Sequence, residues 1–284
     1  MTEAFCPGHV SCIFSPYRDA DIMRTGSSGV GLKLGLGAHS KVSFAEKTEI
    51  YLDGKLSEAP VTARAAELVD PGGNYRIEIS SDLPVSQGFA MSAAGSIAAA
   101  LCVSELAGKS REEAYAAAHR AEAERGGGLG DAVAIAYGFR VPVRTAPGMP
   151  PFGKVEDSGI RMEKIVLAVL GPKMPTGKVL SDDAAVSAIC REAASAMEDF
   201  LGDPSAENLF ICSNAFSRRS RLRGKQVSDA VWKLAAHGYD AGMCMLGNSI
   251  FTDAPAREVS GLFPDAEVFS CPLTDKKPEI IRKG

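Results

Sequence analysis

Two stretches of the sequence combine residue types that suit phosphate chemistry. In the first, a loop over residues 84–90 that holds proline and glycine leads into the alanine-rich segment 92–106, which we predict to be a helix ending at Gly108. Free N–H groups and the positive dipole end at a helix start bind anions, and small side chains let a phosphate approach the backbone. The same residues also fit a plain loop-to-helix joint packed by alanines.

The second stretch places two carboxylates on either side of a glycine run. Glu122 lies near the end of a predicted helix over 111–124, Gly126 to Gly128 follow, and Asp131 begins the next element. Because glycine permits a tight turn, the two carboxylates can converge on one site, where they would suit a magnesium ligand and a base for a hydroxyl group. Alternatively, Asp131 only caps a helix and Glu122 is a solvated charge. Glu124 faces nearly the opposite way from Glu122 on a helix, so we expect Glu122 alone to face the site.

The elements that must position these residues alternate between strands and helices. We predict a strand over 9–14 after a turn at Pro7-Gly8, and a loop over 26–31 within a glycine-rich stretch. Apolar periodicity predicts further strands over 42–44, 49–52, 75–80, 139–143, 165–170, 239–246, 249–252 and 267–271. It predicts further helices over 61–69, 131–137, 181–201, 206–222 and 227–236. We place a lobe boundary near residue 155, between an N-terminal lobe (1–155) and a C-terminal lobe (156–284).

Composition excludes several classes of protein. The chain has 284 residues and a formal net charge of −4, so it lacks the basic field expected of a nucleic-acid or anionic-membrane binder. No run of 18 apolar residues predicts a transmembrane helix. The seven cysteines form no C-x-x-C pair, which argues against zinc and disulfides and favours reduced thiols in the cytoplasm.

Together the two stretches resemble motifs of the GHMP kinase superfamily, which includes galactokinase, homoserine kinase and mevalonate kinase. The second motif of that family, P-x-x-x-G-L-G-S-S-A-A, is matched at Pro84, Gly88, Ser92, Ala93 and Ala94. Phe89, Ala90 and Met91 depart from it. Pro7-Gly8-His9-Val10 is similar to the first motif, P-G-[RK]-V, with His9 in place of the basic residue, and residues 238–247 echo the glycine-rich third motif.

Within the superfamily the chain looks most like archaeal pantoate kinases. Pro7-Gly8-His9, the loop 26–31 and the passage from Ala121-Glu122 to Gly128-Leu129-Gly130-Asp131 carry this likeness. The resemblance implies a two-lobed α+β fold with mixed and antiparallel sheets packed against helices, and it is compatible with a homodimer. It implies ATP- and magnesium-dependent phosphorylation of the primary hydroxyl of pantoate to 4-phosphopantoate, a step in coenzyme A biosynthesis.

The resemblance also implies roles for individual residues. ATP would be bound by Pro84, Ser86, Gly88, Ala90, Met91, Ser92, Ala93, Ala94 and Gly95. Ser92 and Glu122 would hold magnesium, and Asp131 would act on the substrate hydroxyl. Arg144 would hold the substrate carboxylate, since a planar guanidinium binds carboxylate bidentately, although a surface ion pair is the alternative. Ser27, Ser28 and His9 are further candidates for the substrate pocket, and His9 fits a packing or capping role equally well.

Two other functions remain open at this point. A GHMP kinase for another small alcohol, such as homoserine, mevalonate or shikimate, would keep the same carboxylates in a different pocket. A catalytically inactive nucleotide-binding regulator would explain the altered residues 89–91 and the divergent third motif. Ser92, Glu122 and Asp131 oppose the second alternative.

Overall fold

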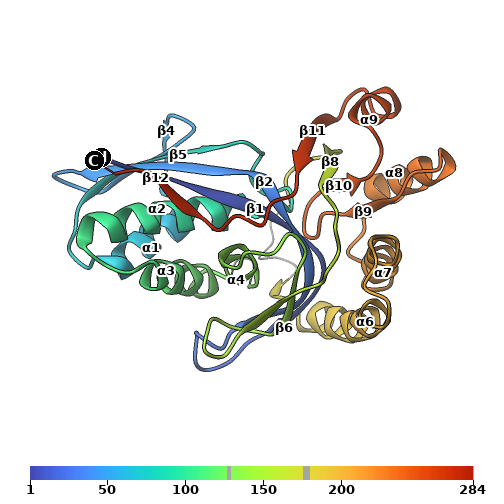
Figure 1. The fold of residues 1–284 in the computed structure, drawn as a ribbon, viewed down its shortest axis with the longest axis horizontal. Helices are drawn as coiled ribbons and strands as arrows, with labels where there is room; N and C mark the ends of the chain where they lie inside the picture. The colour runs from blue at the N-terminus through green and yellow to red at the C-terminus, as the bar shows by residue number, and fades with distance from the viewer. Residues whose placement is uncertain (127–128, 175–179, 284) are drawn as a thin grey trace.

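The computed structural model describes residues 1–126, 129–174 and 180–283, and it is built around two sheets (Figure 1). The larger sheet has eight strands, and its main path runs in the order β12-β1-β2-β5-β3-β4, with β6 on β2 and β7 on β6. Its strands are β1 (Thr2–Tyr17), β2 (Gly26–Phe44), β3 (Glu49–Leu52), β4 (Lys55–Leu56), β5 (Tyr75–Ser81), β6 (Pro142–Ala146), β7 (Lys154–Asp157) and β12 (Glu279–Arg282). The pairings are antiparallel except between β3 and β5, so the sheet is mixed, as expected.

Helices α1 (Pro60–Val69), α2 (Met91–Ala107), α3 (Arg111–Glu124) and α4 (Asp131–Ala136) pack together beside this sheet (Figure 1). A capping box of Ser110 and Glu113 begins α3, which covers the predicted helix 111–124. Helix α2 is buried on all sides from Ala93 to Ser104, because its alanines and glycine let both the strands and the neighbouring helices approach closely. It is the central helix that presents its N-terminus to the candidate site.

The second sheet has four strands in the order β11-β8-β10-β9. They are β8 (Lys164–Val169), β9 (Ala241–Met243), β10 (Ser249–Thr252) and β11 (Glu267–Pro272). Helices α7 (Ala206–Arg219), α8 (Lys225–Ala236) and α9 (Ala256–Leu262) pack against this sheet, and α6 (Asp183–Gly202) packs on α7 and β1 (Figure 1). Within the described parts of the chain, no helix is both long and apolar enough to cross a bilayer.

The predicted α+β class is confirmed, but the first two strands are longer than predicted. Pro7 and Gly8 lie inside β1 and form no turn there, and residues 26–31 belong to β2 and are not a loop. The glycines of β2 suggested a loop, but they lie in a strand where neighbouring groups come close to the backbone. A Cβ at Gly31, for example, would overlap the ring of His9. The strand predicted over 139–143 is also shifted, since β6 covers Pro142–Ala146.

The last strand of the chain returns to the first sheet. β12 pairs antiparallel with β1, bringing Arg282 opposite Glu3, so the two ends of the chain lie side by side (Figure 1). Apart from β12, the large sheet is made from residues before 158, and the second sheet begins at Lys164. The lobe boundary at 155 stays a proposal, and a C-terminal lobe starting there would have to exclude β7 and β12.

Candidate active site

A cavity of about 250 Å³ opens where β1, the loop before α2, α3 and the start of α4 meet. The polar side chains that line it include Ser27, Ser86, Ser92, Glu122 and Asp131. From Ser27 to Asp131, these residues span just over 100 positions of the sequence. The structure thus brings the loop residues and both predicted carboxylates to one place, as expected from the two stretches of sequence.

The start of α2 forms one wall of this cavity. The helix begins at Met91, and its N-cap residue Ala90 has a left-handed backbone (φ 56°) and makes no side-chain cap to the first turn. Ser92 is exposed on this turn and lines the cavity with Ala93. An uncapped helix start with a hydroxyl and small neighbours is suited to an anion.

The predicted nucleotide residues divide into two groups. Ser86, Gly88, Ala90, Met91, Ser92 and Ala93 line the cavity, whereas Pro84, Ala94 and Gly95 are not among its lining residues. Gly95 faces β5 instead, because a Cβ built there would lie 3.3 Å from Cγ2 of Ile79. Only one side of the second motif therefore faces the cavity, and the other side packs the helix.

The end of the divergent third motif (238–247), together with the residues that follow it and Gly171, supports the loop before α2. Gln87 is buried; its Nε2 donates to the carbonyl of Gly171 at 2.9 Å, and its Oε1 accepts from the N–H of Asn248 at 3.2 Å. The hydroxyl of Ser249 donates to the carbonyl of Gln87. Gly247 lies so close to the same carbonyl that a Cβ there would overlap it.

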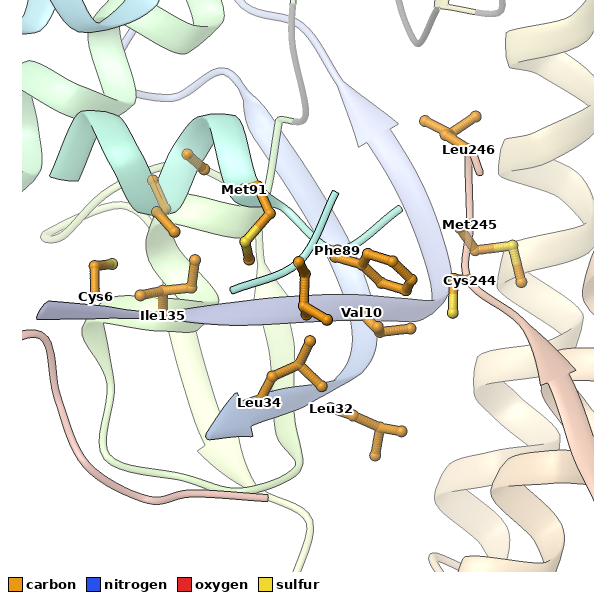
Figure 2. Packing of buried hydrophobic residues seen from close by; sticks show 14 of the residues in the cluster. Cys6, Val10, Leu32, Leu34, Phe89, Met91, Ile135, Cys244, Met245 and Leu246 are labelled. Carbon is orange, nitrogen blue, oxygen red and sulfur yellow. The ribbon is translucent and has the colours of Figure 1, made fainter. Parts of the chain in front are cut away.

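Apolar side chains complete this contact between the loop and the third motif. Figure 2 shows Phe89 and Met91 beside β1, with Cys244, Met245 and Leu246 at the side nearer the C-terminal lobe. Met245 and Leu246 also line the cavity, and the N–H of Met245 donates to the carbonyl of Ser11 at 3.3 Å. The residue types of the third motif have changed, but it still contacts the loop.

The two glutamates at the end of α3 have different surroundings. Glu122 is buried and lines the cavity, as predicted. Glu124 faces away from it and contacts Nε of Arg64 at 2.8 Å and Nε of Arg120 at 2.7 Å. Hydrogen bonds from Arg64 and Arg120 lower the pKa of Glu124 to about 2. Gly127 and Gly128 of the glycine run after α3 lie outside the described residues.

Asp131 is the first residue of α4 and does not cap it. The N-cap is Gly130, which provides no side-chain cap, so the alternative that Asp131 is an N-cap is wrong. Its Oδ1 instead lies 2.8 Å from Nδ1 of His9, a residue 122 positions earlier in the chain. The Asp131 side chain is 20% exposed and lines the cavity, whereas His9 is fully buried behind it.

Arg144 on β6 is also buried, with 1% of its surface exposed, so the surface-ion-pair alternative is wrong. Its Nε donates to the carbonyl of Ser27 at 3.2 Å and its Nη2 to Oγ of Ser11 at 3.4 Å. Its Nη1 lies 3.4 Å from Nε2 of His9. Arg144 and His9 are therefore not among the lining residues, and they form a layer directly beneath Ser11, Ser27 and Asp131.

Sequence reasoning missed Ser11 and overstated Ser28. Ser11 lines the cavity and follows His9 by two residues on β1, so both side chains share a face of the strand. The same period of two sends the side chain of Ser28 to the face opposite Ser27, and Ser28 does not line the cavity. The alternation of side chains between the two faces of β1 and β2 could have separated Ser27 from Ser28. It is not visible when residues 26–31 are interpreted as a loop.

The donor set of the cavity fits a hard divalent cation. Ser92 and Glu122 both present oxygen to the same space, and Mg²⁺ is usually held by one or two protein carboxylates together with substrate phosphates. Within residues 1–126, 129–174 and 180–283, no cluster of three or more His, Cys, Asp or Glu side chains forms a separate metal centre. A site that depends on phosphate oxygens as further ligands agrees with both observations.

The fold and the site define the class of protein. Residues 60–139 match the family model described as the GHMP kinases N terminal domain. Solved structures with the same fold include a mevalonate kinase (TM-score 0.69, 14% identity, covering 97% of this chain and 100% of that one). They also include the Lactococcus lactis galactokinase (TM-score 0.72, 12% identity, 98% and 94%). Residues 60–139 therefore match the GHMP kinase family, and the whole chain has the fold of these kinases, which confirms the resemblance seen in the sequence.

Nearer relatives narrow the class. The chain is 29% identical over 280 residues to a pantoate kinase of Thermococcus kodakarensis, covering 93% of this chain and 92% of the relative. It is 26% identical over 251 residues to a pantoate kinase of Methanocaldococcus jannaschii, covering 87% and 90%. A solved structure described as a phosphotransferase related to the CoA biosynthesis pathway has a TM-score of 0.87 at 27% identity, covering 99% of this chain and 98% of that one.

Proposed function

We propose that this protein is an ATP-dependent kinase that phosphorylates the primary hydroxyl of pantoate, giving 4-phosphopantoate for coenzyme A synthesis. One observation carries the proposal: Ser92 at an uncapped helix start, Glu122 and Asp131 all line one cavity in a GHMP kinase fold. The full-length similarity to two pantoate kinases selects the substrate among the small alcohols of this superfamily.

The loop and the start of α2 would bind the phosphates of ATP. Partial positive charge at the helix start attracts the phosphate oxygens, and the small residues Ala90 and Ala93 let them approach the backbone. The hydroxyl of Ser92 and the carboxylate of Glu122 would hold Mg²⁺ beside these phosphates. When bound, the ion neutralises charge that builds on the transferred phosphoryl group.

Asp131 would orient the acceptor hydroxyl and take its proton. Phosphoryl transfer depends mainly on in-line positioning and on charge neutralisation, so a fixed carboxylate opposite the phosphate-binding helix start is the feature required. A positioned general base contributes about 10²–10⁴ in rate. Oδ1 of Asp131 lies 2.8 Å from the buried ring of His9.

Arg144 would attract the carboxylate of pantoate from beneath the cavity floor. The burial of Arg144 lowers its pKa, but a guanidinium remains charged at neutral pH. Its hydrogen bonds reach Ser11 and Ser27, both of which line the cavity, so we assign the direct contact with the carboxylate to this part of the wall. Ser27 remains a substrate-binding candidate, and Ser28 loses that role.

A panel of small alcohols assayed for ATP consumption tests this function directly. We expect turnover with pantoate and only background rates with homoserine, mevalonate and shikimate. Faster turnover with one of the other alcohols would keep the kinase and replace the substrate. Nucleotide binding without turnover of any alcohol would instead indicate the inactive regulator.

Two further expectations from the sequence remain proposals. We propose that the protein acts in the cytoplasm and that it forms a homodimer. Size-exclusion chromatography with light scattering measures the second directly, and a monomer at micromolar concentration would contradict it.

A further inference from the structure

His9 takes the place of a lysine or arginine of the first GHMP motif, yet it does not reach the cavity. Its ring is fully buried, and both ring nitrogens face other side chains. Nδ1 lies 2.8 Å from Oδ1 of Asp131, and Nε2 lies 3.4 Å from Nη1 of Arg144. The ring therefore bridges the two charged residues of the acceptor side, which are themselves far apart in the sequence.

The chemistry of the two partners decides which ring nitrogen carries the proton. Arginine has only donors, so a hydrogen bond from Arg144 requires an unprotonated Nε2. The carboxylate of Asp131 only accepts, so Nδ1 must carry a proton to donate to it. Both conditions are met by the neutral imidazole protonated at Nδ1. Burial, together with the positive charges of Arg144 and Lys33, lowers the pKa of His9 against the opposite effect of Asp131, which agrees with a neutral ring.

The surroundings leave this ring little freedom to move. A side chain at Gly31 would overlap Nε2, so the backbone of β2 lies directly against the ring. Arg144 is held in turn by the carbonyl of Ser27 and the hydroxyl of Ser11. At Gly130 a Cβ would lie 2.8 Å from Nε of Arg144, so the residue preceding Asp131 also lies against the guanidinium.

We propose that neutral His9, held in its Nδ1-protonated form by Arg144, is a positioning residue that fixes the carboxylate of Asp131. This inference rests on the proposed kinase reaction for its functional part. The hydrogen bond occupies Oδ1 and leaves Oδ2 of Asp131 for the acceptor hydroxyl. His9 itself touches neither substrate nor nucleotide, and it supplies a donor without adding positive charge next to the base.

Two variants of His9 separate the donor from the ring. His9→Leu removes both hydrogen bonds, and we expect kcat to fall about ten- to a hundredfold while the KM for ATP stays within about twofold. His9→Asn places an amide N–H near the position of Nδ1, and we expect it to restore most of the lost kcat. A matched control is His39→Asn, since His39 is half exposed and lies 3.8 Å from Asp82 outside the cavity; it should leave kcat unchanged.

The ¹⁵N shifts of the imidazoles measure the tautomer without any substrate, which separates this inference from the kinase proposal. The chain has only four histidines, and the signal lost in His9→Asn identifies His9. At pH 7 we expect a protonated Nδ1 and an unprotonated Nε2. A proton on Nε2, or on both nitrogens, overturns the inference.

The kinetic measurements on the His9 variants can also contradict the inference. Near wild-type kcat in His9→Leu overturns the positioning role, as does an Asn variant that is no better than Leu when both bind ATP normally. If His9→Leu does not fold, His9→Asn and the ¹⁵N shifts still decide.

Discussion

The two ends of the cavity are formed by different kinds of groups: a loop and a helix start at one end, and charged side chains at the other. The loop end, residues 86–93, presents small side chains and the start of a helix. It is held against residues 244–249 by hydrogen bonds of Gln87 with Ser249 and Asn248 and by the close approach of the two backbones at Gly88 and Gly247. The carboxylate end consists of Asp131, His9 and Arg144, three side chains joined by hydrogen bonds and mostly buried. We therefore expect the loop end to tolerate changes of residue type and the carboxylate end to depend on individual atoms.

At the carboxylate end, we expect the largest loss of activity from Asp131→Asn. The amide has nearly the same volume as the carboxylate but cannot accept the proton, so we expect kcat to fall about 10²–10⁴-fold. The measurement is kcat together with ATP binding and the thermal midpoint. Because Gly130 and not Asp131 occupies the N-cap position of α4, the midpoint should change little. Turnover close to that of the wild type would remove Asp131 as the base.

A second test of this end is Arg144→Ala. Loss of a charge-assisted contact costs roughly 1.5–3 kcal/mol, which corresponds to a rise of about ten- to a hundredfold in the KM for pantoate. Arg144→Lys should recover only part of this, since an ammonium keeps the charge but lacks the planar fork that donates to both Ser27 and Ser11. The KM for ATP should barely change. The exposed Arg161, which pairs with Asp157, provides the control Arg161→Ala. If ATP binding weakens and pantoate binding does not, Arg144 acts on the loop end.

The two glutamates of α3 test which carboxylate belongs to the cavity. Glu122→Gln should raise the Mg²⁺ concentration needed for half-maximal rate by about tenfold, because one anionic ligand is lost. Glu124→Gln should have little effect on rate, because Glu124 only joins Arg64 and Arg120 at the surface, where such pairs contribute little. A magnesium titration of both variants measures the difference, and the reverse order would assign the ligand to Glu124.

The smallest effect is expected at the loop end, from Gly247→Ala. The added Cβ would overlap the carbonyl of Gln87 and push the loop, so we expect the KM for ATP to rise several-fold with pantoate binding unchanged. Gly261→Ala in α9 is the control, because a Cβ there meets nothing within 4 Å. If Gly247→Ala changes the KM for pantoate more than that for ATP, the two ends are not independent.

Local signals in the sequence predicted most of the helices, although α9 was not predicted. The capping box at Ser110, the glycine after α2 and the alanine pattern of 92–106 act over a few residues, so α2 and α3 were placed within a residue or two. Helix geometry indicated that only one of Glu122 and Glu124 could face the site; Glu122 lines the cavity and Glu124 pairs with Arg64, while the role of Glu122 as a ligand stays a prediction.

The strands and the carboxylate end could not be predicted in the same way. The glycines of β2 have the local pattern of a loop, but their purpose is to admit neighbours such as His9, and those neighbours are fixed only by tertiary structure. The contacts of His9 with Asp131 and Arg144 span 122 and 135 positions, which no spacing rule covers. Resemblance to a family suggested the role of Asp131, but the contacts by which His9 joins Asp131 to Arg144 are visible only in the folded structure.

The return of β12 to β1 has a consequence for how the chain folds as it leaves the ribosome. β1 is made long before its partner β12, so the outer edge of β1 between Glu3 and Phe5 stays unpaired until residues 279–282 have been made. Unpaired edges favour pairing between chains and aggregation. The larger sheet, although most of it comes first in the sequence, is thus completed only when residues 279–282 are released.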